Sequence, residues 1–239
     1  MKFLKTLFLA NLLFIVPGSI YAQEGFSLSA NIGLTNDYKY YGTTFSNEEW
    51  AVSGGLDIGH TSGFYLGSWV SSIDFNSDAS DPAKVEWHIY AGYANELDNG
   101  LGYDISVKRY GYPGQNEDDG TGQYNYYEFI AGISYEFSGD LAPVLNGGVA
   151  ISPDYFGDGG TSIYVTSGLT ISLPAELSGY ISYGYLDVDD INLAYSHYAL
   201  GISRYFAGFG FDISWNDADS ECGGKELCQG FVLNITKEF

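Results

Sequence analysis

The chain has 239 residues, and its 30 Asp and Glu against nine Lys and Arg give a formal net charge of −21. Such an acidic excess argues against binding of nucleic acid, whose phosphates require clustered Lys and Arg. Aromatic residues make up 17 % of the chain and glycines number 32. Beyond the amino terminus no stretch approaches the roughly 20 apolar residues that a membrane helix needs.

The amino-terminal segment has the layout of a secretory signal peptide. Two lysines precede an apolar run over residues 7–16, and the small residue Ala22 stands before the polar Gln23. We therefore expect residues 1–22 to be a cleaved signal peptide and residues 23–239 to form one domain. Export to an oxidising compartment favours a disulfide between Cys222 and Cys228, with a metal-binding pair as the alternative.

The rest of the chain consists of segments in which apolar and polar residues alternate, which predicts strands with one apolar face. The clearest is 127–137, and the last ten residues end the chain on the aromatic Phe239, as the closing strand of an outer-membrane barrel does. The twelve predicted strands are 26–40, 50–60, 64–73, 85–93, 101–107, 127–137, 141–151, 162–173, 180–186, 193–205, 209–216 and 230–239. An even number suits a single antiparallel barrel.

The connections between these strands alternate between long and short. The long ones are 41–49, 74–84, 111–123, 152–161, 187–192 and 217–229, and the short ones are 61–63, 95–100, 138–140, 174–179 and 206–208. All long loops then lie at one end, and both termini lie with the short turns. This arrangement predicts an all-β, antiparallel transmembrane barrel with turns in the periplasm and loops outside, whereas a soluble sandwich would mix the lengths.

Two stretches resemble a known family. Residues 29–44 read SANIGLTNDYKYYGTT, and residues 62–69 read SGFYLGSW. They are similar to the TorF-type porins of the Gcw_chp family, in which an Asp-Tyr pair precedes Arg-Gly and a Ser-Gly-Phe-Tyr precedes Gly-x-Trp. Tyr41 stands here at the position of the Arg, and Ser68 fills the Gly-x-Trp. The resemblance implies an outer-membrane porin, and it implies no particular substrate.

Catalytic and metal-binding motifs are not apparent. An outer-membrane lipase would need a His paired with a Ser on the lipid face, but His88 and His197 have lumenal parity and His60 lies at a short turn. Glu86 and His88 share a face, yet two ligands are too few for a metal site. Acidic clusters at 116–120, 187–190 and 216–219 lack the spacing of a calcium loop, so we interpret them as solvated. We expect no enzymatic activity, no cofactor and no bound metal.

Strand parity also predicts the residues that line the pore. Opposite the apolar faces, the acidic residues are Asp37, Asp57, Glu86, Asp104, Glu128, Glu136, Asp212 and Glu238, and the basic residues are Lys39 and Lys108. A net negative wall attracts cations and repels anions. The alternative is that these carboxylates pair with the lysines or lie at the water interface, which would leave little selectivity.

Aromatic residues near the strand ends predict interfacial girdles. They are Tyr38, Tyr40, Trp50, Trp69, Trp87, Tyr110, Tyr126, Tyr135, Phe137, Tyr205 and Trp215.

The sequence thus predicts a cation-preferring diffusion channel for small solutes in the bacterial outer membrane. The alternative is a filled barrel whose external loops act as an adhesin or binding surface. The expected partners are outer-membrane lipid, small solutes, and the barrel-assembly machinery acting on the carboxy-terminal strand that ends in Phe239.

Overall fold

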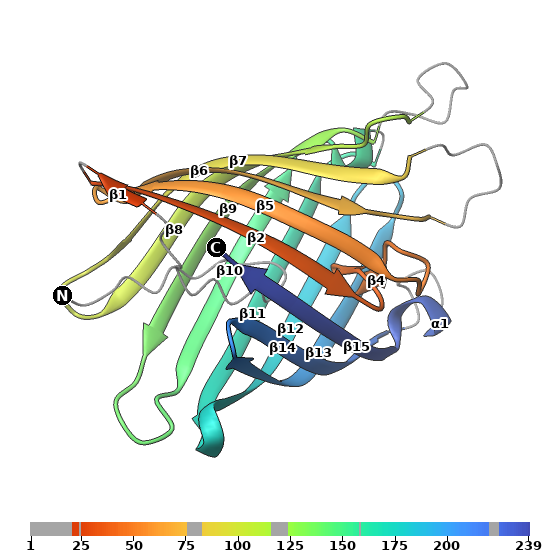
Figure 1. Ribbon diagram of the computed structural model, residues 1–239. Helices are drawn as coiled ribbons and strands as arrows, with labels where there is room; N and C mark the ends of the chain where they lie inside the picture. Colours follow the sequence, from red (N-terminus) through yellow and green to blue (C-terminus); the bar gives the residue numbers. More distant parts are fainter. Residues whose placement is uncertain (1–20, 24, 76–82, 116–123, 158, 220–224) are drawn as a thin grey trace.

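Twelve antiparallel strands close into a barrel in the computed structural model, which describes residues 21–23, 25–75, 83–115, 124–157, 159–219 and 225–239. Each barrel strand pairs with its neighbour in the chain, and the last strand, β15, pairs with the first, β2 (Figure 1). The strands are β2 (Phe26–Thr35), β5 (Ala51–His60), β6 (Phe64–Ser72), β7 (Val85–Glu96), β8 (Leu101–Gly111), β9 (Tyr126–Glu136), β10 (Val144–Ser152), β11 (Ser162–Leu173), β12 (Leu177–Val188), β13 (Leu193–Phe206), β14 (Phe209–Ala218) and β15 (Gly230–Glu238). The predicted fold class is confirmed.

The remaining elements are short. β1 (Tyr21–Gln23) pairs with β2 and spans the predicted cleavage site, while residues 1–20 lie outside the described residues. Two single turns of 3-10 helix, η1 (Tyr155–Gly157) and η2 (Pro174–Glu176), and the helix α1 (Lys225–Cys228) lie in the connections. Among the described helices, none is long and apolar enough to cross a membrane.

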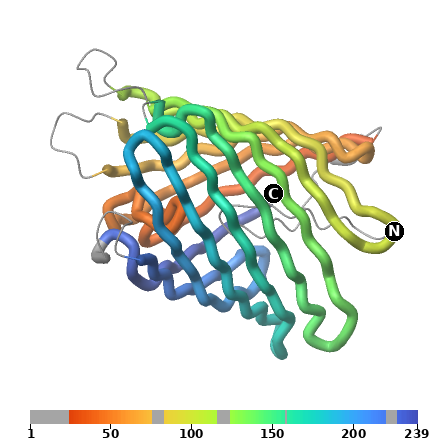
Figure 2. Tube along the Cα trace, turned by 180° about the vertical axis from the view of Figure 1, so that it is seen from behind, coloured from red at the N-terminus to blue at the C-terminus, as the bar shows by residue number. Residues whose placement is uncertain are grey.

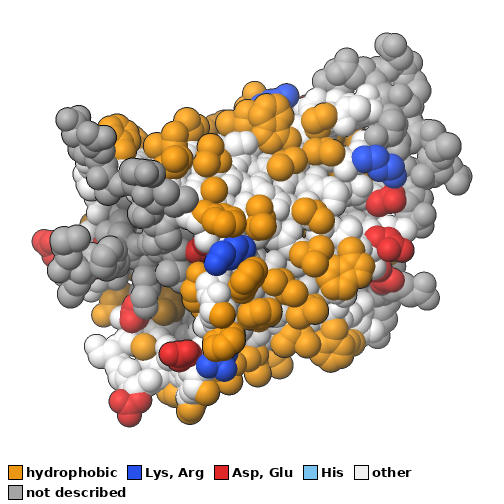
Figure 3. Space-filling view, viewed as in Figure 1, with side chains coloured by type: hydrophobic (Ala, Val, Ile, Leu, Met, Phe, Trp, Pro, Cys, Tyr) orange, Lys and Arg blue, Asp and Glu red, His pale blue; other side chains and the backbone are white. Residues whose placement is uncertain are grey.

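The outer face of the barrel is apolar. In β9, Phe129 and Ile133 point outward and are 58 % and 57 % exposed, whereas Glu128 and Ile130 point inward and are 1 % and 7 % exposed. Large apolar side chains spread across the outside over the strands (Figure 3). A continuous apolar surface of this kind is what a lipid bilayer covers.

The two ends of the barrel differ, as the connection lengths predict. Short turns such as residues 61–63 and 207–208 lie at one end, which we call the short-turn end. The tilted strands run from these turns to the opposite, long-loop end, which carries α1 and β4 (Figure 1, Figure 2).

The first long connection differs from the prediction. β2 ends at Thr35 rather than at residue 40, and residues 36–49 turn into the barrel (Figure 1). This segment, the infolded loop, forms a hairpin of β3 (Lys39–Tyr40) and β4 (Thr43–Thr44). Its turn residues, Tyr41 and Gly42, have φ of 47° and 85°, which is the left-handed conformation that a tight I′ hairpin turn requires.

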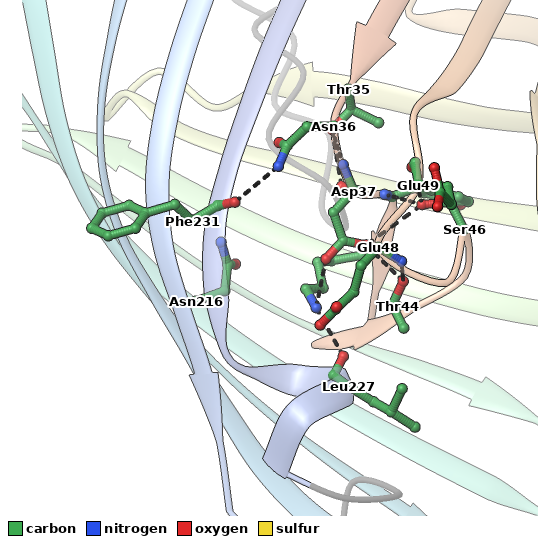
Figure 4. A network of polar contacts seen from close by, with 12 residues as sticks. Thr35, Asn36, Asp37, Thr44, Ser46, Glu48, Glu49, Asn216, Leu227 and Phe231 are labelled. Carbon is green, nitrogen blue, oxygen red and sulfur yellow. Dashed lines mark hydrogen bonds and ion pairs between the residues drawn. The ribbon is translucent and has the colours of Figure 1, made fainter.

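Asn36 explains where the strand ends. Its side-chain amide donates to the Phe231 carbonyl at 3.2 Å (Figure 4). Its side-chain oxygen accepts from the Leu233 N–H at 2.6 Å. The side chain thus takes over the pairing with β15 that a further backbone residue of β2 would have supplied. The backbone after Asn36 is then free to leave the wall and enter the lumen.

Part of the predicted aromatic girdle is wrong. Trp50, Trp87, Tyr135 and Phe137 are exposed on the outside, and Trp215 packs against Phe231 across β14 and β15. Tyr205 is exposed at the short-turn end, but it has the inward parity of β13. Five others, however, are packed inside the barrel, namely Tyr38, Tyr40, Trp69, Tyr110 and Tyr126. The first two lie in the infolded loop, and the other three have the inward parity of their strands.

Candidate functional site in the barrel lumen

Glu128 lies at the centre of a buried cluster in the long-loop half of the lumen. Tyr110 donates a hydrogen bond to it at 2.6 Å, Tyr41 contacts its two oxygens at 2.8 and 3.0 Å, and Tyr40 donates at 3.3 Å. Tyr126 continues the chain by donating to the Tyr40 hydroxyl at 3.0 Å. Wall and loop are therefore joined through one carboxylate.

Glu86 forms a second anchor of the same kind and is fully buried. It accepts hydrogen bonds from Tyr38 of the infolded loop at 2.7 Å and from Tyr112 at 2.8 Å. The Nε2 atom of His88 lies 3.2 Å from Glu86 Oε1, the oxygen that also accepts from Tyr112. We call Glu86, Glu128 and the tyrosines bound to them, Tyr38, Tyr40, Tyr41, Tyr110 and Tyr112, the mouth cluster.

The tip of the infolded hairpin contacts the opposite wall. The Tyr41 ring stacks on Tyr164 of β11 with centroids 3.8 Å apart, and the Tyr195 hydroxyl of β13 donates to the Tyr41 carbonyl at 2.8 Å. A side chain at Gly42 would collide with His197, so glycine is required there for space as well as for conformation. The loop thus crosses the lumen from β2 to β13.

Polar contacts of Asp37 hold the base of the loop together. Thr44 donates to it at 2.6 Å, and Lys39 forms an ion pair with it at 2.7 Å (Figure 4). The Lys39 ammonium also donates to the Leu227 carbonyl of α1 at 2.8 Å, and its side chain is 7 % exposed. Asp37 and Lys39 were predicted on the pore wall, but they belong to the infolded loop.

The environment of the mouth cluster keeps its tyrosine hydroxyls in the neutral form. Burial and then the Glu86 carboxylate raise the pKa of Tyr38 well above its ordinary value, and burial and then Glu128 do the same for Tyr41. Both tyrosines therefore remain hydrogen-bond donors at any physiological pH. Trp69 Nε1 is buried there without a hydrogen-bond partner among the described residues.

In the short-turn half, the carboxylates have a different environment. Asp57, Asp104 and Asp212 each lie three residues from the short-turn end of their strand and are half-buried. Each accepts one tyrosine hydrogen bond: Tyr90 donates to Asp57 at 2.6 Å, Tyr65 to Asp104 at 2.7 Å and Tyr180 to Asp212 at 2.9 Å.

Glycines make room for these tyrosine rings. A side chain at Gly67 would collide with Tyr90, one at Gly92 with Tyr65, and one at Gly201 with Tyr180. Each glycine lies directly opposite its tyrosine on the neighbouring strand. The rings therefore lie against the wall over a glycine, and their hydroxyls reach a carboxylate without crossing the lumen.

The other predicted lining residues also have inward parity. Lys108 on β8 lies 5.7 Å from the Tyr90 ring centroid and 5.6 Å from that of Tyr110, between the two halves. Glu136 is exposed at the short-turn end of β9, and Glu238 lies near the end of β15. The tyrosines were missed, although Tyr65, Tyr90 and Tyr180 share the inward parity of the residues that were selected.

Metal and thiol predictions are tested in part. Within the described residues, no group of three or more His, Cys, Asp or Glu could hold a metal ion. The acidic cluster at 116–120 and Cys222 lie outside the described residues. Cys228 is fully buried, and no described cysteine is free. The Cys222 and Cys228 disulfide remains a prediction.

A closed twelve-stranded barrel with an apolar exterior and ionisable groups inside defines the class of porin-like β-barrels. Among solved structures, the fold is similar to that of the KdgM porin, with a TM-score of 0.56, 8 % identity and coverage of 88 % of this chain and 99 % of that one. It is similar to the NanC porin, with a TM-score of 0.54, 10 % identity and coverage of 88 % and 98 %. It is also similar to the COG4313 outer membrane channel from Pseudomonas putida F1, with a TM-score of 0.53, 14 % identity and coverage of 94 % and 100 %. At these identities the similarity shows the fold.

The Gcw_chp family, described as a bacterial protein of unknown function, matches residues 20–232. The chain belongs to this family. A search of curated proteins found no match.

Proposed function

We propose that this protein is a channel of the bacterial outer membrane that passes small solutes, with the infolded loop setting the size limit at the long-loop end. The observation that carries the proposal is a combination of two features. The outer face is apolar, and the short-turn half of the lumen contains the half-buried Asp57, Asp104 and Asp212. The fold shared with the KdgM and NanC porins and the COG4313 channel supports it. On its motif residues, we group the chain with the TorF-type porins.

The proposed setting is the outer membrane with the short turns in the periplasm, following export by the predicted signal peptide. The proposed partners are outer-membrane lipid, small solutes, and the barrel-assembly machinery, which would act on the strand ending in Phe239. That strand closes the barrel, because the Phe239 and Ala30 backbones exchange hydrogen bonds of 2.9 and 3.1 Å beyond the paired residues of β15 and β2.

The proposed ion preference is for cations, and the carboxylates that carry it are those of the short-turn half. Glu86 and Glu128 are enclosed by tyrosines, whereas Asp57, Asp104 and Asp212 each bond to one tyrosine and face the lumen. A KdgM porin structure was determined with oligogalacturonate, a carboxylated sugar chain. The acidic lumen of the present chain disfavours such a polyanion.

Conductance of single channels in planar bilayers tests the proposal. We expect discrete steps from the wild-type protein, and larger steps from a variant in which residues 38–45 are replaced by a short Gly-Ser linker. A barrel that yields no steps in either form would contradict channel function.

The alternative is a filled barrel whose external loops bind a partner. The burial of Tyr40, Tyr110 and Tyr112, each at most 2 % exposed, favours it, because these rings pack across the lumen at the long-loop end. This alternative predicts no steps from the wild-type protein and steps from the variant without the loop.

A further inference from the structure

Charged residues at the short-turn rim are unevenly distributed around the barrel. Acidic residues lie around β7 to β12, at Glu96, Asp98, Glu136, Asp140 and Glu176, and one more, Glu238, lies on β15 with the inward parity of that strand. Among the described residues at this end, Lys and Arg occur at Arg204 on β13 and Lys237 on β15. Two of the few cations of an acidic chain are therefore placed in one sector of the rim.

Both cations have the parity of the lipid-facing side chains. Arg204 alternates with the outward Ile202 and is exposed, and Lys237 alternates with Leu233 and Ile235 on β15. Lys237 occupies a position where the alternation calls for an apolar residue. Basic side chains are set within the apolar surface over β13–β15 (Figure 3).

Aromatic rings connect the two cations. The Arg204 guanidinium lies 5.3 Å from the Phe206 ring centroid, and the Lys237 ammonium lies 4.8 Å from that of Phe209. Phe206 and Phe209 are paired across β13 and β14. Together with Phe239, which is 45 % exposed and 5.9 Å from the Lys237 ammonium, they form a continuous surface that we call the rim patch.

The acidic residues beside the rim patch do not neutralise it, because Glu238 has the inward parity of β15 and Glu176 forms an exposed ion pair with Arg204. Glu176 lies 3.5 Å from the Arg204 guanidinium, but both side chains are largely exposed, at 79 % and 42 %. An exposed pair of this length is weak and leaves the cation available to a second anion. An anionic headgroup offers a phosphate to the cations, while its acyl chains cover the phenylalanines.

We propose that the rim patch binds the headgroup of an anionic phospholipid in the leaflet at the short-turn end. Arg204 and Lys237 contact the phosphate, and Phe206, Phe209 and Phe239 pack against the upper part of the acyl chains. The lipid lies beside the seam at which β15 closes on β2, where five residue pairs are in register, compared with eight between β14 and β15. This binding is independent of whether the lumen conducts.

Native mass spectrometry of the full-length mature protein tests this binding. The protein is released from micelles that contain equal amounts of phosphatidylglycerol and phosphatidylcholine with identical acyl chains. We expect the wild type to retain phosphatidylglycerol preferentially. Each of Arg204→Gln and Lys237→Gln reduces the preference about fivefold, which corresponds to about 1 kcal/mol for one basic residue at an anionic surface.

Arg109→Gln is the matched control, because Arg109 has the same outward parity on β8 but lies at the long-loop end. It should leave the preference unchanged. Equal retention of the two lipids by the wild type, or an equal loss in Arg109→Gln, would overturn the proposal. Folding of each variant is checked by heat-modifiable migration, and Lys237→Leu, which restores the apolar alternation, replaces Lys237→Gln if that variant does not fold.

Discussion

The two halves of the lumen use the same pair of groups, a tyrosine hydroxyl and a carboxylate, in different proportions. In the long-loop half, Glu128 is 1 % exposed and accepts hydrogen bonds from Tyr40, Tyr41 and Tyr110. In the short-turn half, Asp57 is half-buried and accepts one, from Tyr90.

The number of donors decides what the carboxylate can do. A buried charge needs several hydrogen bonds to compensate for its loss of hydration, and once compensated it acts as an anchor for the groups around it. A carboxylate with one hydrogen-bond donor and access to the lumen still exerts an electric field on ions in the lumen. The mouth cluster therefore holds a loop, and the short-turn half is the part of the wall that a passing ion can sense.

The largest effect is expected from Glu128→Ala. The change leaves Tyr40, Tyr41 and Tyr110 without their acceptor, and each buried hydroxyl left unpaired costs about 1–3 kcal/mol. We expect the infolded loop to be released, which raises the single-channel conductance and makes Lys39, whose side chain is now 7 % exposed, a site of tryptic cleavage. Asp57→Ala is the control and should leave Lys39 protected. Cleavage at Lys39 in the wild type at the same rate would contradict this division of roles.

Arginine substitutions along β9 test the outer face and both halves of the lumen. Ala131→Arg places a charge on the lipid face and should cost about 2–4 kcal/mol if it lies near the bilayer midplane. Ile130→Arg should be equally damaging, because that inward site is 7 % exposed beneath the infolded loop. Gly132 is also buried, but an arginine there can pair with the carboxylate of Asp104, the residue opposite on β8, so Gly132→Arg should cost less than the other two changes. Unfolding in urea and heat-modifiable migration measure all three, and equal losses at residues 131 and 132 would argue against the barrel parity.

The fold could be predicted from the sequence because one period describes every barrel strand. Alternation assigns each residue to lipid or lumen without knowledge of its neighbours, and turn lengths then assign the ends. β11 has the predicted bounds, and β9 is shifted by one residue at each end. The inward parity of Glu86, Asp104 and Lys108 follows from the same rule.

The infolded loop could not be predicted by this rule. Residues 36–40 continue the alternation of β2, so a local pattern extends the strand, whereas the turn inward depends on Asn36 bonding to Phe231 and Leu233, almost 200 residues away in the chain. The turn at Tyr41 and Gly42 also lacks the Asn or Asp that usually marks an I′ turn. The family motif includes Tyr38 and Trp69. The rings of these two residues pack with centroids 5.5 Å apart, so the motif joins the infolded loop to the barrel wall.

A smaller effect is expected from removing one hydroxyl in each half. Tyr41→Phe removes hydrogen bonds to a buried carboxylate, which are worth about 1.5–3 kcal/mol. Tyr65→Phe removes a hydrogen bond to Asp104, which is half-buried and can bond to water instead. We expect more frequent openings to the larger conductance in Tyr41→Phe and an unchanged conductance in Tyr65→Phe. The reverse order would show that the short-turn half, rather than the mouth cluster, limits passage.

The smallest effect in free energy is expected from charge neutralisation. It is measured as a change in ion selectivity. Asp57→Asn, Asp104→Asn and Asp212→Asn together remove the half-buried charges of the short-turn half, so the reversal potential under a KCl gradient should move from cation-selective toward zero. Glu86→Gln should shift it less, because that carboxylate is fully enclosed by Tyr38, Tyr112 and His88. A unit charge 4 Å from an ion contributes about 1 kcal/mol in water, and salt screens this interaction, with a Debye length of about 10 Å at 0.1 M. The cation preference of the wild type should therefore weaken as the salt concentration rises above about 0.1 M. An anion-selective wild type, or a potential that the three substitutions leave unchanged, would show that these aspartates do not set the field of the lumen.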